Sequence, residues 1–474
     1  MNEHRAPFVK TAWILLISLV IGIAYLQTLP NQSETASERD VTGEVLSKMH
    51  GEIVLGMAST PGVEQSEIIS LAQSLNAGSV GQRQRYMALM IALGDKEAAN
   101  QASEQMYKEL ELLDRSLGDK QQHVQEELDT LILGGDIPSE GDFLTDQLGW
   151  FGTLLVADSK ERESLNQIAE LKVVVLLLFV LGIVILGTLG FIGIVICTAF
   201  IFSGKIKSSL QVLDFSEESR TSGKQPIRHG IYVEVFVLWL IVFLVFGILA
   251  DPVADLILED NTFVSMSMKL LTFFMSLIVL FWARIRGISG QIMRQDIGLT
   301  KGRGVFIECF FGLAGYAMML PMLAVGLFFT FLLFQLQSMG AGVPDPFSGT
   351  GGGSHPIVVE IAEANIGVKT LLFILGAFAA PIVEEIMFRG VLYRQLRSMS
   401  VRFGLALSII VSILVTSFLF AAIHPQGWVA IPALMSIAIG MNVMREWRGS
   451  LLPSMIVHGV SNGLIISLML TFLS

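Results

Sequence analysis

The sequence contains few cysteines and few charged residues for a chain of 474 residues. Its two cysteines, Cys197 and Cys309, both lie in apolar runs, so neither a disulfide framework nor a cysteine metal site is indicated. Charged residues make up 15% of the chain, hydrophobic residues 52%, and the mean hydropathy is +0.64. Because a soluble protein of this length needs more surface charge, we expect an all-α, polytopic membrane protein.

Positive charge is also scarce. The formal net charge is −11, which argues against a nucleic-acid partner. Residues 31–171 hold 25 acidic and 10 basic residues, a net of −15, so the rest of the chain is +4. One acidic, polar block is therefore inserted in a weakly basic, apolar body.

Several apolar runs reach about 20 residues, the length at which a helix crosses the hydrocarbon layer of a membrane. We expect nine spans, of which the second and fifth are long enough to tilt or to continue outside the bilayer. The predicted spans are residues 11–29, 172–202, 231–250, 263–283, 305–335, 368–391, 405–424, 428–445 and 453–473.

Lys and Arg residues follow the second, fourth, sixth and eighth spans, whereas the connections 251–262, 336–367 and 425–427 contain none. Short cytoplasmic loops are enriched in these residues, so we expect a cytoplasmic N-terminus and an extracytoplasmic block at 31–171. The first span could be a cleaved signal peptide, but its apolar core of about 17 residues is long for one and favours an uncleaved anchor.

Residues 31–171 show apolar positions at three- and four-residue steps, which predicts helices. The sequence "LGD" occurs twice, 24 residues apart, and suggests turns between stacked helical hairpins. An irregular helical bundle with a solvated acidic face fits the same pattern. Nothing in this block indicates catalysis, and a protein partner is a possible reason for it.

The segment "AAPIVEEIMFRGVLYRQLR" carries Glu384, Glu385 and Arg389 at the end of an apolar run. Each charge near the centre of a bilayer costs about 2.5–3.5 kcal/mol, so these groups must be paired, interfacial or in a wet cavity. Glu385 and Arg389 are four residues apart and meet on one helix face, which leaves Glu384 free to point elsewhere. A position at the membrane interface would also explain Arg389, but it suits two short carboxylates less well.

Two further stretches place polar residues in apolar spans. In "SFLFAAIHPQG", Phe420 lies one turn before His424; in "PSMIVHGVSNG", His458 and Asn462 are four apart and share a helix face. Each could be a structural hydrogen-bonding group. Together with Glu384 they could perform hydrolysis, because a carboxylate with an imidazole can take a proton from water. A second imidazole and an amide can then donate hydrogen bonds to the developing oxyanion.

The motifs "EEIMFR", "FAAIH" and "HGVSN" resemble, in order and spacing, the EExxxR, FxxxH and HxxxN motifs of the CPBP family of CAAX-protease-like and abortive-infection membrane proteins. The resemblance covers about residues 297–474 and implies an intramembrane endopeptidase. We therefore expect four parts, which are a membrane anchor at 1–30, an extracytoplasmic helical domain at 31–171, additional transmembrane helices at 172–290 and the protease core at 291–474.

The resemblance implies that Glu384 and His424 activate the attacking water, and that His458 and Asn462 stabilise the oxyanion. Glu385, Arg389 and Phe420 would support the site. Glu384, His424 and His458 could in principle bind zinc as two imidazoles and a carboxylate. The helix-borne HExxH spacing is absent and the water-activation scheme needs no metal, so we expect no cofactor. The expected partners are a peptide or protein substrate at the membrane and the lipid bilayer.

Helix lengths raise one difficulty for this site. With the turn between the sixth and seventh spans near residue 400, straight helices place Glu384 and His424 about 24 and 36 Å from it. His458 would lie about 15 Å past the following turn near residue 448. Helix tilt, or a turn nearer residue 404, would narrow the gap.

Two other classes of protein remain open from the sequence. A non-proteolytic scaffold or immunity protein that keeps the fold could bind a partner through residues 31–171. A transporter or channel could relay ions through its buried carboxylates and histidines, but the sequence shows no internal repeat between its halves.

Overall fold

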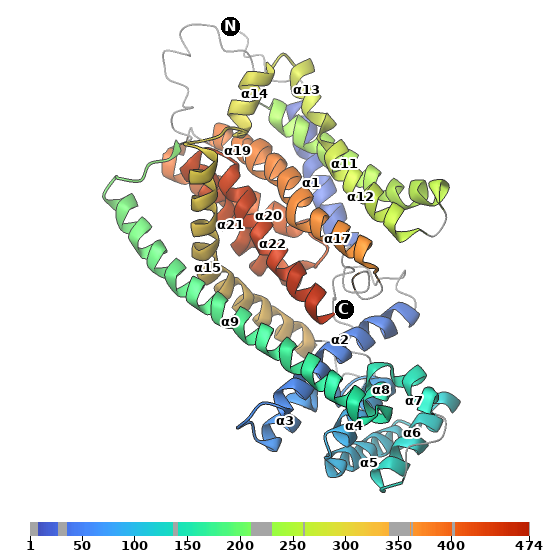
Figure 1. Cartoon of the computed structure of the whole chain (residues 1–474). Helices are drawn as coiled ribbons and strands as arrows, with labels where there is room; N and C mark the ends of the chain where they lie inside the picture. The colour runs from blue at the N-terminus through green and yellow to red at the C-terminus, as the bar shows by residue number, and fades with distance from the viewer. Residues whose placement is uncertain are drawn as a thin grey trace, which may run out of the picture. The chain divides into compact units, whose positions relative to one another are not determined.

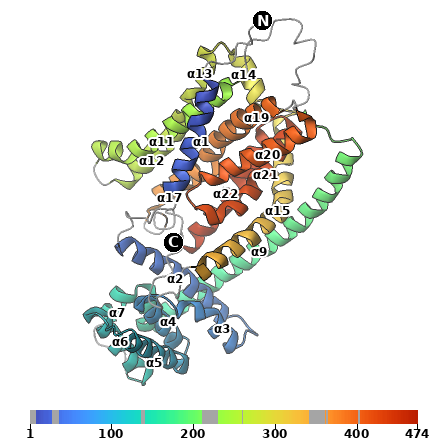
Figure 2. The ribbon, with the colours of Figure 1, turned by 180° about the vertical axis from the view of Figure 1, so that it is seen from behind.

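The computed structural model describes residues 8–26, 36–135, 141–209, 230–258, 261–340, 361, 364–400 and 403–473. These described residues form helices and turns, with no strand among them (Figures 1 and 2). The chain divides into two compact units. The first, the bundle unit, comprises Met1–Pro30, Ile183–Ser338 and Ala364–Leu468, and the second, the hairpin unit, comprises Asn31–Gly182, Met339–Glu363 and Met469–Ser474. The four parts expected from the sequence stay a prediction.

The hairpin unit is built around α4, which packs against α5, α6 and α8. A capping box between Ser79 and Gln82 starts α4, and the Asp95 carboxylate accepts the Ala98 N–H at the start of α5. Both "LGD" sequences lie between helices. The helices of this unit are α2 (Ala36–Ala58), α3 (Gln65–Ala72), η1 (Gln73–Leu75), α4 (Val80–Ala92), α5 (Lys96–Leu112), α6 (Asp119–Ile132), α7 (Gly141–Leu148) and α8 (Trp150–Val156).

The helix α9 (Ser159–Phe202) begins in the hairpin unit and ends in the bundle unit. Within the hairpin unit it packs on α2, where Lys172 Nζ lies 2.6 Å from the Glu52 carboxylate and both side chains are buried. The predicted span starts at residue 172, whereas the helix starts at Ser159. The polar segment before the span therefore continues the same helix, as the length of the run allowed.

The bundle unit contains the remaining long helices. Its N-terminal part consists of α1 (Val9–Leu26), α11 (Ile231–Ile257), α12 (Thr262–Ser276), η3 (Leu277–Val279), α13 (Leu280–Ile285), α14 (Gly290–Ile297) and α15 (Val305–Gly340). Its C-terminal part consists of α17 (Ile366–Ile374), η4 (Leu375–Ala379), α18 (Ala380–Glu385), η5 (Ile386–Leu392), α19 (Tyr393–Ser400), α20 (Leu405–Ala422), η7 (Trp428–Ala430), α21 (Ile431–Arg448) and α22 (Leu452–Phe472). Both views show α19, α20 and α21 side by side (Figures 1 and 2).

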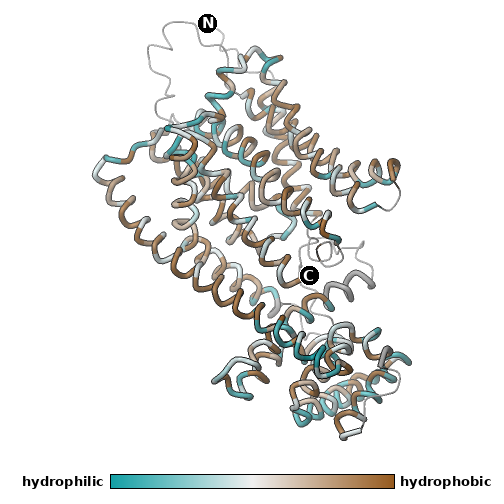
Figure 3. The backbone as a smooth tube through the Cα atoms, viewed as in Figure 1, coloured by the Kyte–Doolittle hydropathy of each residue, from teal (hydrophilic) through white to brown (hydrophobic). Residues whose placement is uncertain are grey.

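Nine helices of the described part of the chain are long and apolar enough to cross a membrane, which confirms the predicted number. These helices are coloured mostly as hydrophobic in Figure 3. Large apolar side chains are exposed along them, among them Phe191 on α9, Ile248 on α11 and Phe306 on α15. Such surfaces are stable in lipid, and the chain is an integral, multi-pass membrane protein. The side of the membrane on which each end lies stays a prediction.

Candidate active site

The two motif glutamates lie on a helix that changes its winding twice. Ile366–Ser400 is one continuous helix, and its segments η4 and η5 are π-helical while α18 between them is α-helical. The Ala380 N–H bonds Leu375 O and the Tyr393 N–H bonds Phe388 O, both five residues back. Single π-helical turns occur mostly within α-helices and often at functional sites. Glu384 and Glu385 end the short α-helical stretch between two of them.

Glu385 and Arg389 form a buried ion pair at the centre of the site. Arg389 Nη1 donates to Glu385 Oε1 at 2.8 Å, and neither side chain is exposed. His458 Nδ1 lies 2.9 Å from the same oxygen, so α22 is tied to the helix of the glutamates. Because of this burial the Arg389 side chain does not extend to solvent. Each group neutralises the charge of the other, which surrounding lipid could not do.

Glu384 points to a different set of partners, on its neighbouring helix face. Its Oε2 lies 4.0 Å from His424 Nε2 and 3.8 Å from His458 Nε2. The side chain is 16% exposed and that of His424 is 20% exposed, whereas His458 is buried. Glu384 Oε2 accepts no hydrogen bond among the described residues. One carboxylate oxygen from α18 and two imidazole nitrogens, one from α22 and one from the turn after α20, therefore converge.

The hydrogen bonds made by the two Nδ1 atoms determine the tautomer of each imidazole, and so whether the Nε2 atom that faces Glu384 carries a proton. His424 Nδ1 lies 2.6 Å from Phe420 O, and a carbonyl can only accept, so this nitrogen carries a proton. The ionised Glu385 carboxylate likewise accepts from His458 Nδ1. In a neutral ring the Nε2 atom is then an acceptor. The three atoms that converge are all acceptors, an arrangement that suits a species with protons to donate, such as water.

Phe420 packs beneath both imidazoles and covers the ion pair. Its ring centroid lies 4.2 Å from that of His424 and 5.8 Å from that of His458, and the Arg389 guanidinium lies 4.5 Å from its centre. Phe388 contacts the same ring at 5.1 Å and continues into an aromatic cluster on α11. This apolar wall of aromatic rings restricts the rotamers of the two imidazoles and excludes water from the ion pair.

Asn462 lies one turn beyond His458 on α22, as its spacing predicts, but its amide is turned toward η4. Its Nδ2 donates to Gly376 O at 3.0 Å. An NH₂ group has two N–H bonds, so one donor is used by this main-chain carbonyl and one is left for another acceptor. The close approach needs glycine on α22, since a Cβ at Gly459 would lie 2.7 Å from Ala377 O.

The helix ends narrow the difference in level that straight helices suggested. The helix α19 ends at Ser400 and α20 begins at Leu405, so Glu384 lies about 24 Å before the first of these ends and His424 about 29 Å after the second. Near the end of α21, Glu446 accepts from Tyr393 and Arg397 on α19. On the following helix, α22, His458 lies against Glu385.

Glu384 Oε2 lies farther from the two imidazoles than the ligands of a bound zinc lie from one another. Ligands roughly 2.0–2.2 Å from a tetrahedral zinc lie about 3.3–3.6 Å from one another, closer than the distances from Glu384 Oε2 to the two rings. No group of three His, Cys, Asp or Glu side chains in the described part of the chain is placed to hold a metal ion. We therefore derive no step through a metal.

Sequence reasoning missed the buried arginines of the basic connections. Arg445 and Arg397 follow apolar spans and were interpreted as loop residues, yet both are buried within helices. Arg397 pairs with Glu446 at 3.1 Å. Arg445 donates to main-chain carbonyls, including that of Arg389 on the helix of the glutamates. The pattern "MREWR", with its acidic residue between two basic ones, was the available signal.

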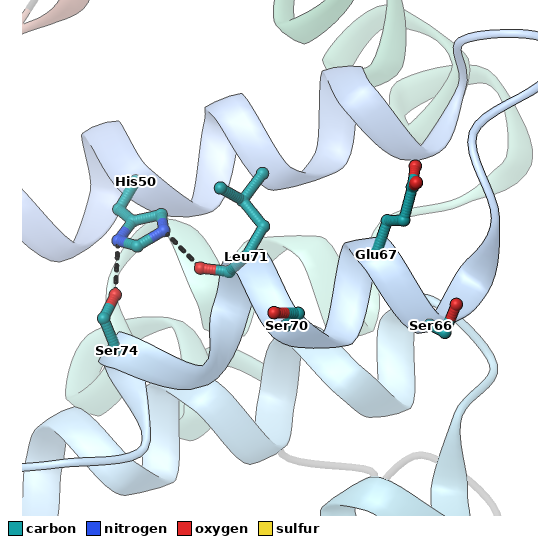
Figure 4. A pocket seen from close by; sticks show the side chains of 6 residues that line it. All are labelled: His50, Ser66, Glu67, Ser70, Leu71 and Ser74. Carbon is teal, nitrogen blue, oxygen red and sulfur yellow. Dashed lines mark hydrogen bonds between the residues drawn. The ribbon is translucent and has the colours of Figure 1, made fainter.

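A shallow depression on the described part of the hairpin unit lies outside this set of residues (Figure 4). Within it His50 Nε2 lies 2.9 Å from Leu71 O, and Ser74 Oγ lies 3.1 Å from His50 Nδ1. Both ring nitrogens therefore join α2 to α3 and η1. The depression is lined by His50, Ser66, Glu67, Ser70, Leu71 and Ser74.

Residues 366–464 match the family model of the type II CAAX prenyl endopeptidase Rce1-like proteins. The match begins at the start of α17 and ends within α22, so it includes every residue of the candidate site. No curated protein and no solved structure matches the chain. This match supports the resemblance of the three motifs to the CPBP family of CAAX-protease-like membrane proteins.

Proposed function

We propose that this protein is an intramembrane endopeptidase in which Glu384 and His424 activate a water molecule. The observation that carries this proposal is the convergence of Glu384 Oε2 on the Nε2 atoms of His424 and His458, at 4.0 and 3.8 Å. A water between these atoms can donate its two protons to two of the three acceptors. Its oxygen lone pair is then directed at the carbonyl carbon of a peptide bond.

Glu384 is the general base of this scheme. Its partial exposure admits water, and the apolar wall of Phe420 and its neighbours limits how many waters enter. The carboxylate takes a proton as the water attacks, and the carboxylic acid then gives that proton to the leaving amine. One residue thus serves both steps, and the carboxylate is restored when the C–N bond breaks.

The tetrahedral oxyanion needs donors. His458 enters this step as the imidazolium, with a second proton taken from solvent before the water attacks, so its Nε2 donates to the oxyanion while Glu384 and His424 accept from the water; the Glu385 carboxylate at Nδ1 stabilises that imidazolium. The N–H of Asn462 that does not bond Gly376 is the second donor. Arg389 neutralises Glu385 and fixes its orientation, which in turn orients His458.

The substrate class follows from the family and from the position of the site. The groups lie in apolar helices, so the peptide bond must enter from the membrane or its boundary. A lipid-modified peptide near its own C-terminus meets this requirement, because the lipid holds the scissile bond at the interface. We propose such a peptide as the substrate, with a farnesylated C-terminal CAAX sequence as the first candidate.

The test uses purified protein in proteoliposomes and a farnesylated CAAX peptide, with the same peptide lacking the farnesyl group for comparison. Wild type is expected to release the C-terminal tripeptide from the farnesylated peptide, and Glu384→Gln to lose at least about a hundredfold of that rate. Glu234→Gln is the control for removal of a buried glutamate charge, because Glu234 lies outside the site, where it accepts from Trp282 and pairs with Arg286 at 3.4 Å. Equal cleavage by wild type and Glu384→Gln would contradict the role of Glu384.

A scaffold or immunity protein is the competing function, and it predicts that Glu384→Gln keeps the biological phenotype.

Metal dependence is tested in the same cleavage assay. We propose a metal-independent reaction, so a chelator that strips zinc is expected to leave the rate unchanged. Loss of activity on chelation, restored by zinc, would show instead that Glu384, His424 and His458 close around a metal.

A further inference from the structure

The two π-helical segments leave main-chain carbonyls without their usual helical donors. In an α-helix the Ala380 N–H would bond Gly376 O, but it bonds Leu375 O, and Pro381 has no N–H to take its place. At the other segment the Tyr393 N–H, which would bond Arg389 O, bonds Phe388 O. A buried carbonyl without a partner costs about 1–3 kcal/mol, so another donor is expected at each.

Side chains from two other helices supply these donors. Asn462 Nδ2 on α22 bonds Gly376 O at 3.0 Å, and Arg445 Nε on α21 bonds Arg389 O at 3.3 Å. One carbonyl lies before the two glutamates and the other lies after them. The α-helical stretch that carries Glu384 and Glu385 is therefore held at both ends by side chains from outside its own helix.

The Arg445 side chain joins three parts of the bundle. Its guanidinium also donates to Asp296 O at 3.0 Å and to Gly449 O, so all three bonds end on main-chain carbonyls. Asp296 lies in the last turn of α14, and Gly449 is the residue that ends α21. Carbonyls at helix C-termini attract a cation, which suits an arginine that is completely buried.

The residues packed around the Arg445 guanidinium leave space only for a planar group. Gly298, with φ of +82°, lies against the guanidinium, and an added Cβ would contact its central carbon. The Gly298 carbonyl accepts the Leu451 N–H at 2.9 Å, which places the start of α22 beside the same arginine. Arg445 thus fixes η5 relative to the turn from which α22 runs to His458.

We propose that Arg445 is a positioning residue of the proposed peptidase site. It sets the rotation and level of the helix of the glutamates against α22, so that Glu384 faces His424 and His458. The inference rests on the proposed function for its kinetic consequence, but its structural consequence does not depend on any activity.

Arg448 provides a matched comparison on the same helix. It is also nearly buried, and its guanidinium makes two bonds to the Glu308 carboxylate, at 2.9 and 2.8 Å, and none to the helix of the glutamates. A merely structural role for Arg445 predicts that lysine at either position has similar effects. A positioning role predicts that only Arg445→Lys disturbs η5.

Hydrogen exchange of the purified proteins in one detergent tests this without a substrate. Lysine keeps the charge but cannot bond three carbonyls from a planar fork. In Arg445→Lys the amides of residues 386–394 are expected to exchange at least about tenfold faster than in wild type, because a missing partner lowers the free energy of local opening. In Arg448→Lys their rate is expected to stay within about twofold. Equal protection of residues 386–394 in the two variants would overturn the proposal.

Kinetics on the farnesylated peptide give the second readout. Arg445→Lys is expected to lower kcat about tenfold to a hundredfold with KM nearly unchanged, because displacement of a general base by about 1 Å has effects of this size. Guanidinium ion added to Arg445→Gly is expected to restore part of kcat, and to have no such effect on Arg448→Gly. Absent cleavage by wild type would count against the proposed function only, while unchanged exchange in Arg445→Lys would count against Arg445.

Discussion

Two neighbouring glutamates are expected to have opposite roles, because their partners differ. Glu385 is completely buried and its Oε1 accepts from Arg389, whereas Glu384 is partly exposed and its Oε2 faces the two imidazoles. The spacing of the motif predicted this division, since Glu385 and Arg389 share a helix face and Glu384 does not.

Glu385→Gln is expected to destabilise the protein by about 3–5 kcal/mol, since it leaves the Arg389 charge buried without its partner. Glu384→Gln is expected to unfold at or above the temperature of wild type, because the new amide can donate toward an imidazole. Thermal unfolding of the purified proteins in one detergent, followed by circular dichroism, measures both. A larger loss of stability in Glu384→Gln than in Glu385→Gln would contradict this assignment of partners.

At the residue scale, the sequence predicted which side chains lie close together in the site. It did not predict every residue that holds them in place. The motif spacing indicated Glu384, His424 and His458. These three residues could be recognised because charged and polar side chains are unusual in apolar segments. Arg445 could not be predicted in the same way, because an arginine after an apolar run is typical of a cytoplasmic loop. Its burial depends on where α21 ends, which local sequence does not determine.

At the scale of helices, the winding around α18 depends on a proline. Pro381 lies in the first turn of α18 and cannot bond a carbonyl of η4, which favours the shift to five-residue bonding. The hydropathy of the span predicted a helix at this position. It carried no signal for π-helical turns, because apolar side chains fit either winding in lipid.

Pro381→Ala is expected to reduce proteolysis at least about tenfold while leaving thermal stability unchanged or higher, since the new N–H allows regular winding and turns Glu384 away from the imidazoles. Pro321→Ala in the middle of α15 is the control, and it is expected to leave the rate within about twofold. Cleavage of the farnesylated peptide measures both. Equal rates in Pro381→Ala and wild type would show that the winding does not depend on this proline.

The contact between α9 and α15 depends on a glycine. A Cβ at Gly190 would collide with Ala317 O, whereas one at Gly182 would meet nothing within 4 Å. Gly190→Ala is therefore expected to lower the unfolding temperature in detergent, and Gly182→Ala to leave it unchanged or slightly higher. Equal unfolding temperatures for the two variants would contradict the close approach of these helices.

At the scale of the whole molecule, the run of apolar segments predicted the nine spans because each must cover the same hydrocarbon thickness. The alternation of basic connections predicts in addition that residues 31–171 are extracytoplasmic. Hydropathy could not predict how deep in the membrane each turn lies, because lipid-facing helices can end at different depths. Those levels were set by polar pairs such as Arg397 with Glu446.

The orientation is tested with single cysteines in a background where Cys197 and Cys309 are replaced by serine. A membrane-impermeant maleimide is expected to label Lys120→Cys in intact cells or spheroplasts, and to label Lys205→Cys only after lysis. Both lysines are exposed, so access depends on the side of the membrane. Labelling of Lys205→Cys alone before lysis would invert the topology.

The central claim is that Glu384 makes this membrane protein a peptidase. The most direct measurement compares the peptide termini in membranes from cells that express wild type, Glu384→Gln or Glu234→Gln at equal levels. The account predicts a set of new termini near membrane boundaries that wild type and Glu234→Gln share and Glu384→Gln lacks. Identical termini in all three would contradict it.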